Sequence, residues 1–168
     1  MKAPYGLPIA RLLPLEDARA VLVGGYHYTW IPAPEASRLT LDASCLGAGV
    51  LAALPADRCG LVETARVLRY LALQSATGQC GPCLNSLPRT AAAFRALAAP
   101  GPQGTVRADL ARWSGLVEGR GACHHPDGTV RPVLRSTLTT FATENDAHAH
   151  GHCTATDRTP LLAVPEES

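Results

Sequence analysis

Three cysteines carry the clearest chemical signal in the sequence. Cys80 and Cys83 enclose a C-G-P-C tetrapeptide, and Cys123 lies 40 positions after Cys83. A C-x-x-C at the start of a helix presents two sulfur atoms at one point, where the helix dipole and free N–H groups favour thiolates. Such thiolates bind zinc, bind iron–sulfur clusters or form a redox-active disulfide.

The spacing of the cysteines leaves several interpretations open. C-G-P-C is also the active-site tetrapeptide of thioredoxins, but there it follows a strand, whereas an amphipathic helix over 62–75 precedes it here. Structural zinc, bound with His124 or His125, would make this a zinc-stabilised interaction domain, although 40 positions is a long gap for a zinc ribbon or finger. Three unrelated buried cysteines in a metal-free interaction domain are the simplest alternative. An iron–sulfur cluster fits best, because clusters combine ligands from one compact loop and a distant segment.

Helical periodicity predicts the elements that position the cysteines. Leu61, Ala65, Leu68 and Ala72 recur at spacings of four and three, which is typical of an amphipathic helix that Gly78 then ends. If the two helices after Cys83 run antiparallel, residue 123 returns beside the C-G-P-C loop. We expect these further helices over residues 83–97, 106–117 and 132–147.

Short extended segments precede the helices. The β-branched run 21–23 leads into Gly24-Gly25 and predicts a strand with a tight turn, and we expect two more strands at 39–41 and 50–54. The aromatic run 26–30 predicts either a docking surface for a partner or a sheet edge packed on the helices.

Composition narrows the function classes. The 168 residues are 46% hydrophobic and 17% charged, so a packed core is expected. A net charge of +1 without a basic stripe argues against nucleic acid as a partner, and no apolar run is long enough for membrane insertion. The N-terminal segment lacks a clean signal peptide, which predicts a cytoplasmic protein. In a reducing cytoplasm, six cysteines indicate metal binding or redox chemistry rather than structural disulfides.

The segment T-G-Q-C-G-P-C at 77–83, followed by Cys123, is similar to the cluster motif of the NADH-binding flavoprotein subunit of respiratory complex I. NAD-reducing hydrogenases and formate dehydrogenases contain related subunits. Segments 46–50 and 59–66 resemble the family's L-G-S-G and C-x-x-x-x-x-A-R segments, and 21–25 resembles the last strand of its β-grasp module. The match extends over roughly residues 20 to 147.

The resemblance implies an α+β fold with a C-terminal four-helix bundle preceded by a partial β-grasp-like module. We expect the module at 1–56, the iron–sulfur-binding bundle at 57–150 and a flexible tail at 151–168. The implied function is electron transfer through an iron–sulfur cluster within an NADH dehydrogenase-type oxidoreductase. The implied cluster ligands are Cys80, Cys83 and Cys123.

Two departures from the family modify this prediction. Thr77 occupies the position of the family's first cluster cysteine, so the cluster is either [4Fe–4S] with another fourth ligand or [3Fe–4S]. The candidates for that ligand are Thr77, His124, His125 and Cys59. The family's glycine-rich flavin and nucleotide region has no counterpart, so we expect this chain alone to bind neither FMN nor NAD. Its expected partner is a flavin-containing or other redox subunit, and its expected location is the cytoplasm, peripheral to a membrane complex.

A histidine-rich run ends the last predicted helix. His148, His150, His152 and Cys153 could capture or deliver a metal, although a solvated tail that picks up metal adventitiously is the simpler interpretation. Cys45 and Cys153 have no motif partner and are expected to be free thiols. No constellation of catalytic Ser, His and Asp or of paired carboxylates stands out.

Overall fold

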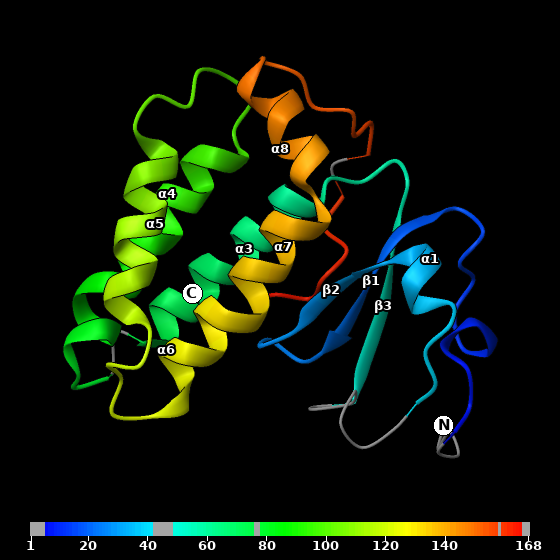
Figure 1. Cartoon of the computed structure of the whole chain (residues 1–168), viewed down its shortest axis with the longest axis horizontal. Helices are drawn as coiled ribbons and strands as arrows, with labels where there is room; N and C mark the ends of the chain where they lie inside the picture. The colour runs from blue at the N-terminus through cyan, green and yellow to red at the C-terminus, as the bar shows by residue number, and fades with distance from the viewer. Residues whose placement is uncertain (1–5, 42–48, 76–77, 158, 166–168) are drawn as a thin grey trace.

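The computed structural model describes residues 6–41, 49–75, 78–157 and 159–165 (Figure 1). Its extended elements within these ranges are β1 (Ala18–Gly24), β2 (Thr29–Pro32) and β3 (Val50–Pro55). Its helical elements are η1 (Ile9–Arg11), α1 (Ala33–Ala36), α3 (Gly60–Gln74), η3 (Pro82–Ser86), α4 (Leu87–Ala98), α5 (Val106–Val117), α6 (His124–Gly128), η4 (Thr129–Leu134), α7 (Arg135–Thr140) and α8 (Ala142–Ala149).

In the described residues, the strands form one antiparallel sheet in the order β2-β1-β3. Central β1 pairs Val21 with Ile31 of β2 and with Ala53 of β3. Gly24 ends β1 at a φ of 123°, a conformation that side chains with a Cβ rarely adopt. The strands predicted at 21–23 and 50–54 are therefore confirmed.

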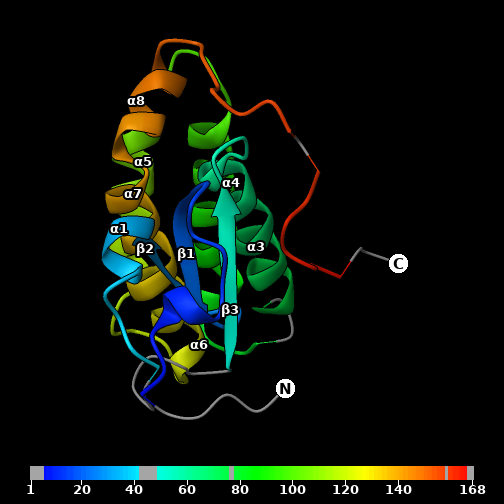
Figure 2. The same ribbon diagram turned by 90° about the vertical axis from the view of Figure 1, so that its right-hand side faces the viewer.

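The two faces of the sheet are buried in different layers (Figures 1 and 2). Because side chains alternate along a strand, Ala20 and Leu22 point into the cluster made with the helices. Val21 and Val23 point the opposite way, against Ile9 of the N-terminal segment and α1. The long helices thus cover one face of the sheet, and the N-terminal segment and α1 cover the other.

Two predictions about the extended segments need comment. The strand predicted at 39–41 is wrong: Thr40 makes only an isolated bridge with Pro8. The segment instead hydrogen-bonds irregular backbone, for example where the Ile9 N–H donates to the Leu39 carbonyl. The aromatic run 26–30 leads into β2 at the sheet edge, and its Tyr28 and Trp30 are buried in the helical core. This arrangement is the second of the two interpretations given for the run.

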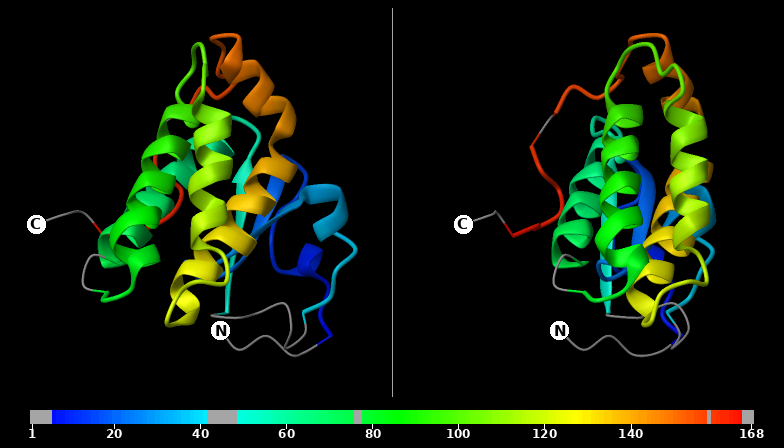
Figure 3. Two further views of the ribbon diagram at one scale, coloured as in Figure 1. Left: turned by 60° about the vertical axis from the view of Figure 1, so that its left-hand side comes forward. Right: turned by 90° about the vertical axis from the view of Figure 1, so that its left-hand side faces the viewer.

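The long helices lie side by side on one face of the sheet, with α4 packed between α3 and α5 (Figure 3). The helix predicted at 106–117 is confirmed as α5. The helix expected at 83–97 begins with the π-helical turn η3 and continues as α4. The helix expected at 132–147 already begins at His124 and is broken at Phe141, which separates α7 from α8.

The fold is α+β, as predicted. The last segment follows α8 without a described helix or strand and runs along the outside of α3 (Figures 2 and 3). The backbone N–H groups of Leu161 and Leu162 donate to the carboxylate of Glu63 on α3. The division of the chain at residues 56 and 150 stays a prediction.

Candidate metal centre

Cys80 and Cys83 lie in the turn between α3 and α4. Ser75 caps the C-terminus of α3, and its buried hydroxyl lies within hydrogen-bond distance of the carbonyl oxygens of Ala72 and Cys83. The N–H of Gly78 donates to the Ser75 carbonyl at 2.8 Å. Ser75 therefore fixes the path of the chain from the end of α3 to the second cysteine.

Cys123 returns to this turn from the far side of two helices. It precedes α6 as its N-terminal cap residue, after α4 and α5 have run up and down the molecule (Figure 1). The backbone N–H of the neighbouring residue Ala122 hydrogen-bonds the sulfur of Cys80. The antiparallel return expected from the 40-position gap is therefore present.

The three thiols differ in exposure and in charge preference. Hydrogen bonds from the backbone N–H groups of Ala122 and Cys83 lower the pKa of Cys80, which is partly exposed. Burial raises the pKa of Cys83 to about 12, with further contributions from the adjacent thiols of Cys80 and Cys123. Cys123 is exposed. Cys83 is thus shielded from solvent, whereas Cys80 and Cys123 lie on the solvent-exposed side of the site.

The three thiols of Cys80, Cys83 and Cys123 do not form a compact set of ligand atoms such as a single bound ion requires. A tetrahedral zinc ion with Zn–S bonds of about 2.3 Å holds its sulfur ligands about 3.8 Å apart. In the described part of the chain, a different set, Cys59, His148 and Cys153, is the only one with three potential ligand atoms all within 4.8 Å of one another. Space is also kept open by Gly78, where an added Cβ would lie 3.3 Å from the Cys83 sulfur.

The candidates for a fourth ligand are placed very differently. His124 is exposed at the first position of α6, next to Cys123, while Thr77 lies outside the described residues. The Nε2 of His125 lies 3.1 Å from the Leu71 carbonyl and so ties α6 to α3. Cys59 caps the N-terminus of α3, a helix of 15 residues. That length puts Cys59 about 22 Å from the turn, so Cys59 is not a ligand there.

Polar contacts hold the segment that leads to Cys123. Gly119, at a φ of 70°, donates its N–H to the carboxylate of Asp127 at 2.7 Å. Glu118 accepts hydrogen bonds from Arg131 and Arg135 on the following helical segment. These contacts close the chain between α5 and α6 and fix the position from which Cys123 reaches the turn.

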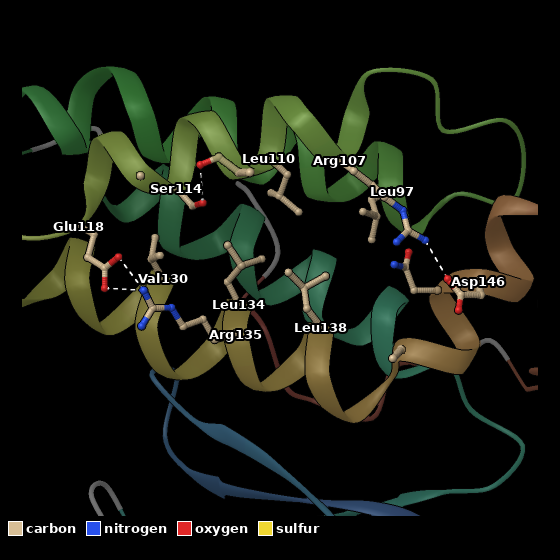
Figure 4. Close-up of a pocket in the computed structure, with 14 residues that line it drawn as sticks. Leu97, Arg107, Leu110, Ser114, Glu118, Val130, Leu134, Arg135, Leu138 and Asp146 are labelled. Carbon is tan, nitrogen blue, oxygen red and sulfur yellow. Dashed lines mark hydrogen bonds and ion pairs between the residues drawn. The ribbon is translucent and has the colours of Figure 1, made fainter.

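A separate groove of about 620 Å³ runs between α5 and the segment η4–α7. Figure 4 shows its apolar floor, including Leu110, Leu134 and Leu138, with the ion pair Glu118–Arg135 at one end and Arg107–Asp146 at the other. Its lining contains no cysteine or histidine among the described residues. The metal chemistry expected from the sequence therefore does not belong to this groove.

The family is decided by sequence comparison over the helical part of the chain. A model of the NADH-ubiquinone oxidoreductase-F iron–sulfur binding region matches residues 62–148, more than half of the chain. The chain belongs to this family. The matched region contains Cys80, Cys83 and Cys123. The prediction of an iron–sulfur electron-transfer module in this family is confirmed, and the cofactor class is an iron–sulfur cluster.

Solved structures share the fold. A crystal structure of NAD+-reducing [NiFe]-hydrogenase in the air-oxidized state matches with a TM-score of 0.75 and 23% identity over 96% of this chain. The H2-reduced state matches with a TM-score of 0.66 and 20% identity over 89% of this chain. The chain spans only 29% and 27% of those hydrogenase chains. No curated protein sequence matches significantly.

None of the described helices is both long and apolar enough to cross a membrane. The sequence places His148 and Cys153 in one histidine-rich run and does not link them to Cys59, yet the structure brings the ligand atoms of all three together near the start of α3. The signal that could have linked them is positional, because Cys59 precedes the first long helix while His148 and Cys153 flank the end of the last one.

Proposed function

We propose that Cys80, Cys83 and Cys123 hold an iron–sulfur cluster through which this chain relays single electrons. The observation that carries the proposal is the convergence of these thiols inside a region that matches an iron–sulfur binding family. When bound, the cluster supplies a one-electron redox centre. The protein supplies ligation, partial exclusion of water and a fixed polar environment.

Each part of the site contributes to that environment. Cys83 anchors the buried side, where the low exposure of its sulfur excludes water. The N–H groups of Ala122 and Cys83 point at the Cys80 sulfur and stabilise negative charge on it. Hydrogen bonds to cluster sulfurs raise the reduction potential, because they favour the more negative reduced state. The exposed side near Cys123 is where electrons can enter or leave.

The cluster type depends on whether a fourth iron is present and on which residue binds it. With three thiolates, the site suits [4Fe–4S] completed by Thr77 or His124, or [3Fe–4S] with no fourth ligand. Either form has one thiolate charge fewer than a four-cysteine site. The reduction potential should therefore be higher than in family members with four cysteines.

The chain works with other redox components in this proposal. It spans less than a third of the hydrogenase chains that it matches, and those proteins are described as NAD+-reducing. We infer that a flavin-containing or other redox subunit exchanges electrons with it and that FMN and NAD bind elsewhere. The helices from α3 to α8 would form the four-helix bundle, and the sheet the partial β-grasp-like module. A cytoplasmic location, peripheral to a membrane complex, belongs to the same proposal.

Anaerobic purification of the full chain tests this function. We expect a brown protein that contains iron and acid-labile sulfide, with an EPR signal after dithionite reduction for [4Fe–4S] or before it for [3Fe–4S]. Cys83→Ser should lose the colour and most of the iron, because it removes the buried ligand. The matched control is Cys153→Ser, which changes a cysteine outside the proposed site and should stay brown.

Two results would contradict the proposal. A colourless wild-type chain that is fully folded and reconstitutes no iron and sulfide would remove the cluster from this site. A Cys83→Ser variant that keeps the wild-type iron content and EPR spectrum would remove Cys83 from the ligand set.

A further inference from the structure

A second set of potential metal ligands lies near the start of α3, at the opposite end of this helix from Cys80 and Cys83. The sulfurs of Cys59 and Cys153 and a ring nitrogen of His148 all lie within 4.8 Å of one another. Cys59 and His148 are buried, and Cys153 is partly exposed. The iron–sulfur site does not use any of these residues.

Contacts between α8 and the start of α3 bring two of the three together. Cys59 caps α3, and its sulfur accepts the N–H of Val62 at 3.4 Å. At the next position, Gly60, an added Cβ would overlap the ring of Phe141, the residue that precedes α8. Glycine at this position lets α8 approach the N-terminus of α3. As a result, the Nε2 of His148 lies 3.7 Å from the Cys59 sulfur.

A Schellman turn brings in the third residue. Gly151 has a φ of 84° and donates its N–H to the His148 carbonyl, while the N–H of His152 donates to the Ala147 carbonyl. This turn reverses the chain directly after α8. Cys153 is thereby placed beside His148 instead of continuing away from it.

The ring nitrogens of His148 are poorly satisfied by the protein itself. Among the described residues, the Nδ1 of His148 is buried without a hydrogen-bond partner, and its Nε2 lies near the sulfur of Cys59, a weak hydrogen-bonding group. Tetrahedral zinc with ordinary Zn–S and Zn–N bonds separates the two ligand atoms by about 3.6 Å. The separation of 3.7 Å between Cys59 and His148 is therefore already suited to a bound ion.

The charges around the set favour a divalent cation. Two cysteine thiolates would neutralise a dication, since thiols lose their protons when they bind a metal. The carboxylate of Glu144 lies 2.6 Å from the Cys59 sulfur and is itself paired with Arg19.

We propose that Cys59, His148 and Cys153 bind one Zn²⁺ ion that fastens the C-terminal segment to the start of α3. Thiolate and imidazole are the donors that zinc prefers, and an open fourth position of a tetrahedral ion can be taken by water. The ion would reinforce neighbouring contacts of the same segment. The N–H groups of Thr156 and Asp157 donate to the Asp57 carbonyl, and Arg58 pairs with Asp157.

Metal analysis of the full chain tests this site independently of the iron–sulfur cluster. We expect one zinc per chain in the wild type and in Cys83→Ser, measured by mass spectrometry alongside iron. Cys153→Ser should keep its iron but weaken Zn²⁺ binding, measured by competition with a chromophoric chelator, by more than about 100-fold. Even residues that only support ligands contribute 10–100-fold. Co²⁺ in place of zinc should show sulfur-to-cobalt absorption that Cys153→Ser diminishes.

The exposed histidines of the same run provide the control. His150→Ala combined with His152→Ala should retain the zinc, because both side chains are exposed. Zinc that is lost from this double variant but retained by Cys153→Ser would show adventitious binding by the tail and overturn the proposal. Zinc that is lost from Cys83→Ser but retained by Cys153→Ser would place the ion at the other cysteines and also overturn it. A folded wild-type chain that binds no Zn²⁺ would do the same.

Discussion

Gly78 occupies a position where a side chain would press on the buried cysteine of the iron–sulfur site. An added Cβ would lie 2.9 Å from the Cβ of Cys83 and 2.9 Å from the Ser75 carbonyl oxygen. Neither neighbour can move freely, because the Ser75 hydroxyl also contacts the Cys83 carbonyl. A methyl group here must displace the turn that carries both Cys80 and Cys83.

We therefore predict that Gly78→Ala lowers both iron content and stability. Overpacking of this kind costs about 1–3 kcal/mol. The iron per chain after anaerobic purification and the free energy of unfolding in urea measure the two effects. Gly81→Ala in the same turn is the matched control, because an added Cβ there meets nothing within 4 Å. Equal iron content and stability in the two variants would show that Gly78 does not shape the site.

Among the residues that could bind metal, the sequence predicts those that form a local motif but not those that only the fold brings together. The C-G-P-C motif is recognisable in the sequence because its two cysteines are only three positions apart. The family resemblance then adds Cys123 as the third ligand. Cys59 and His148 are 89 positions apart, and the packing of Phe141 on Gly60, directly before α8, brings them together. No periodicity or spacing in the sequence predicts that contact. For the same reason the sequence offers no partner for Cys153, which is therefore predicted to be a free thiol.

Among the elements, a buried chain of hydrogen bonds joins β2, α3 and the segment η4–α7. The Trp30 Nε1–H and the Tyr28 hydroxyl both donate to the hydroxyl of Thr64 on α3, at 2.9 and 3.2 Å. The Thr137 hydroxyl donates to the Val133 carbonyl, so Thr64 in turn donates to Thr137. Every lone pair and proton of the Thr64 hydroxyl is used, which fixes the sheet edge against the helices.

Thr64→Val should destabilise the fold by roughly 2–4 kcal/mol, because buried polar groups left without partners cost about 1–3 kcal/mol each. Thr64→Ser is the control, since it keeps the hydroxyl and loses one methyl group, for about 1 kcal/mol. Urea unfolding followed by tryptophan fluorescence measures both variants. If valine proved no more harmful than serine, the hydrogen-bond chain would contribute nothing net to stability.

The prediction of the elements failed where backbone geometry is unusual. Val106–Val117 is a regular amphipathic helix, so its hydrophobic periodicity predicts both the first and the last residue correctly. The sequence predicts a turn over 119–127 and a last helix that begins at about Pro132. In the structure Pro132 lies inside the π-helical segment η4, which begins upstream at Thr129. The break at Phe141, with a φ of −110° and a ψ of 31°, interrupts an otherwise continuous apolar pattern and was not foreseen.

For the molecule as a whole, α3 separates two sites of different chemistry. The cysteines of the iron–sulfur site lie beyond its C-terminal end, while Cys59 caps its N-terminal end. About 22 Å of helix lies between them, so a change at one end should leave metal binding at the other intact. The comparison of Cys83→Ser with Cys153→Ser relies on this separation.

Glu63 is the contact that holds the last described segment against α3. Its carboxylate is buried on α3 and accepts the N–H groups of Leu161 and Leu162 at 3.1 and 3.3 Å, with Arg66 as its ion-pair partner. Leu161 and Leu162 also pack against the core shared by the sheet and the helices. The segment expected as a flexible tail therefore makes specific contacts with the body of the molecule.

Glu63→Gln should release this segment, because the amide replaces one acceptor oxygen with a donor that faces a backbone N–H. Hydrogen bonds to charged groups contribute about 1.5–3 kcal/mol, so the loss should speed amide hydrogen exchange in the peptide 159–165 by at least about tenfold. Mass spectrometry of exchange under native conditions measures this change. Glu35→Gln on the exposed side of α1 is the control and should leave the exchange of that peptide unaltered. Exchange that is already unprotected in the wild type would contradict the docked arrangement and support a flexible tail beyond residue 150.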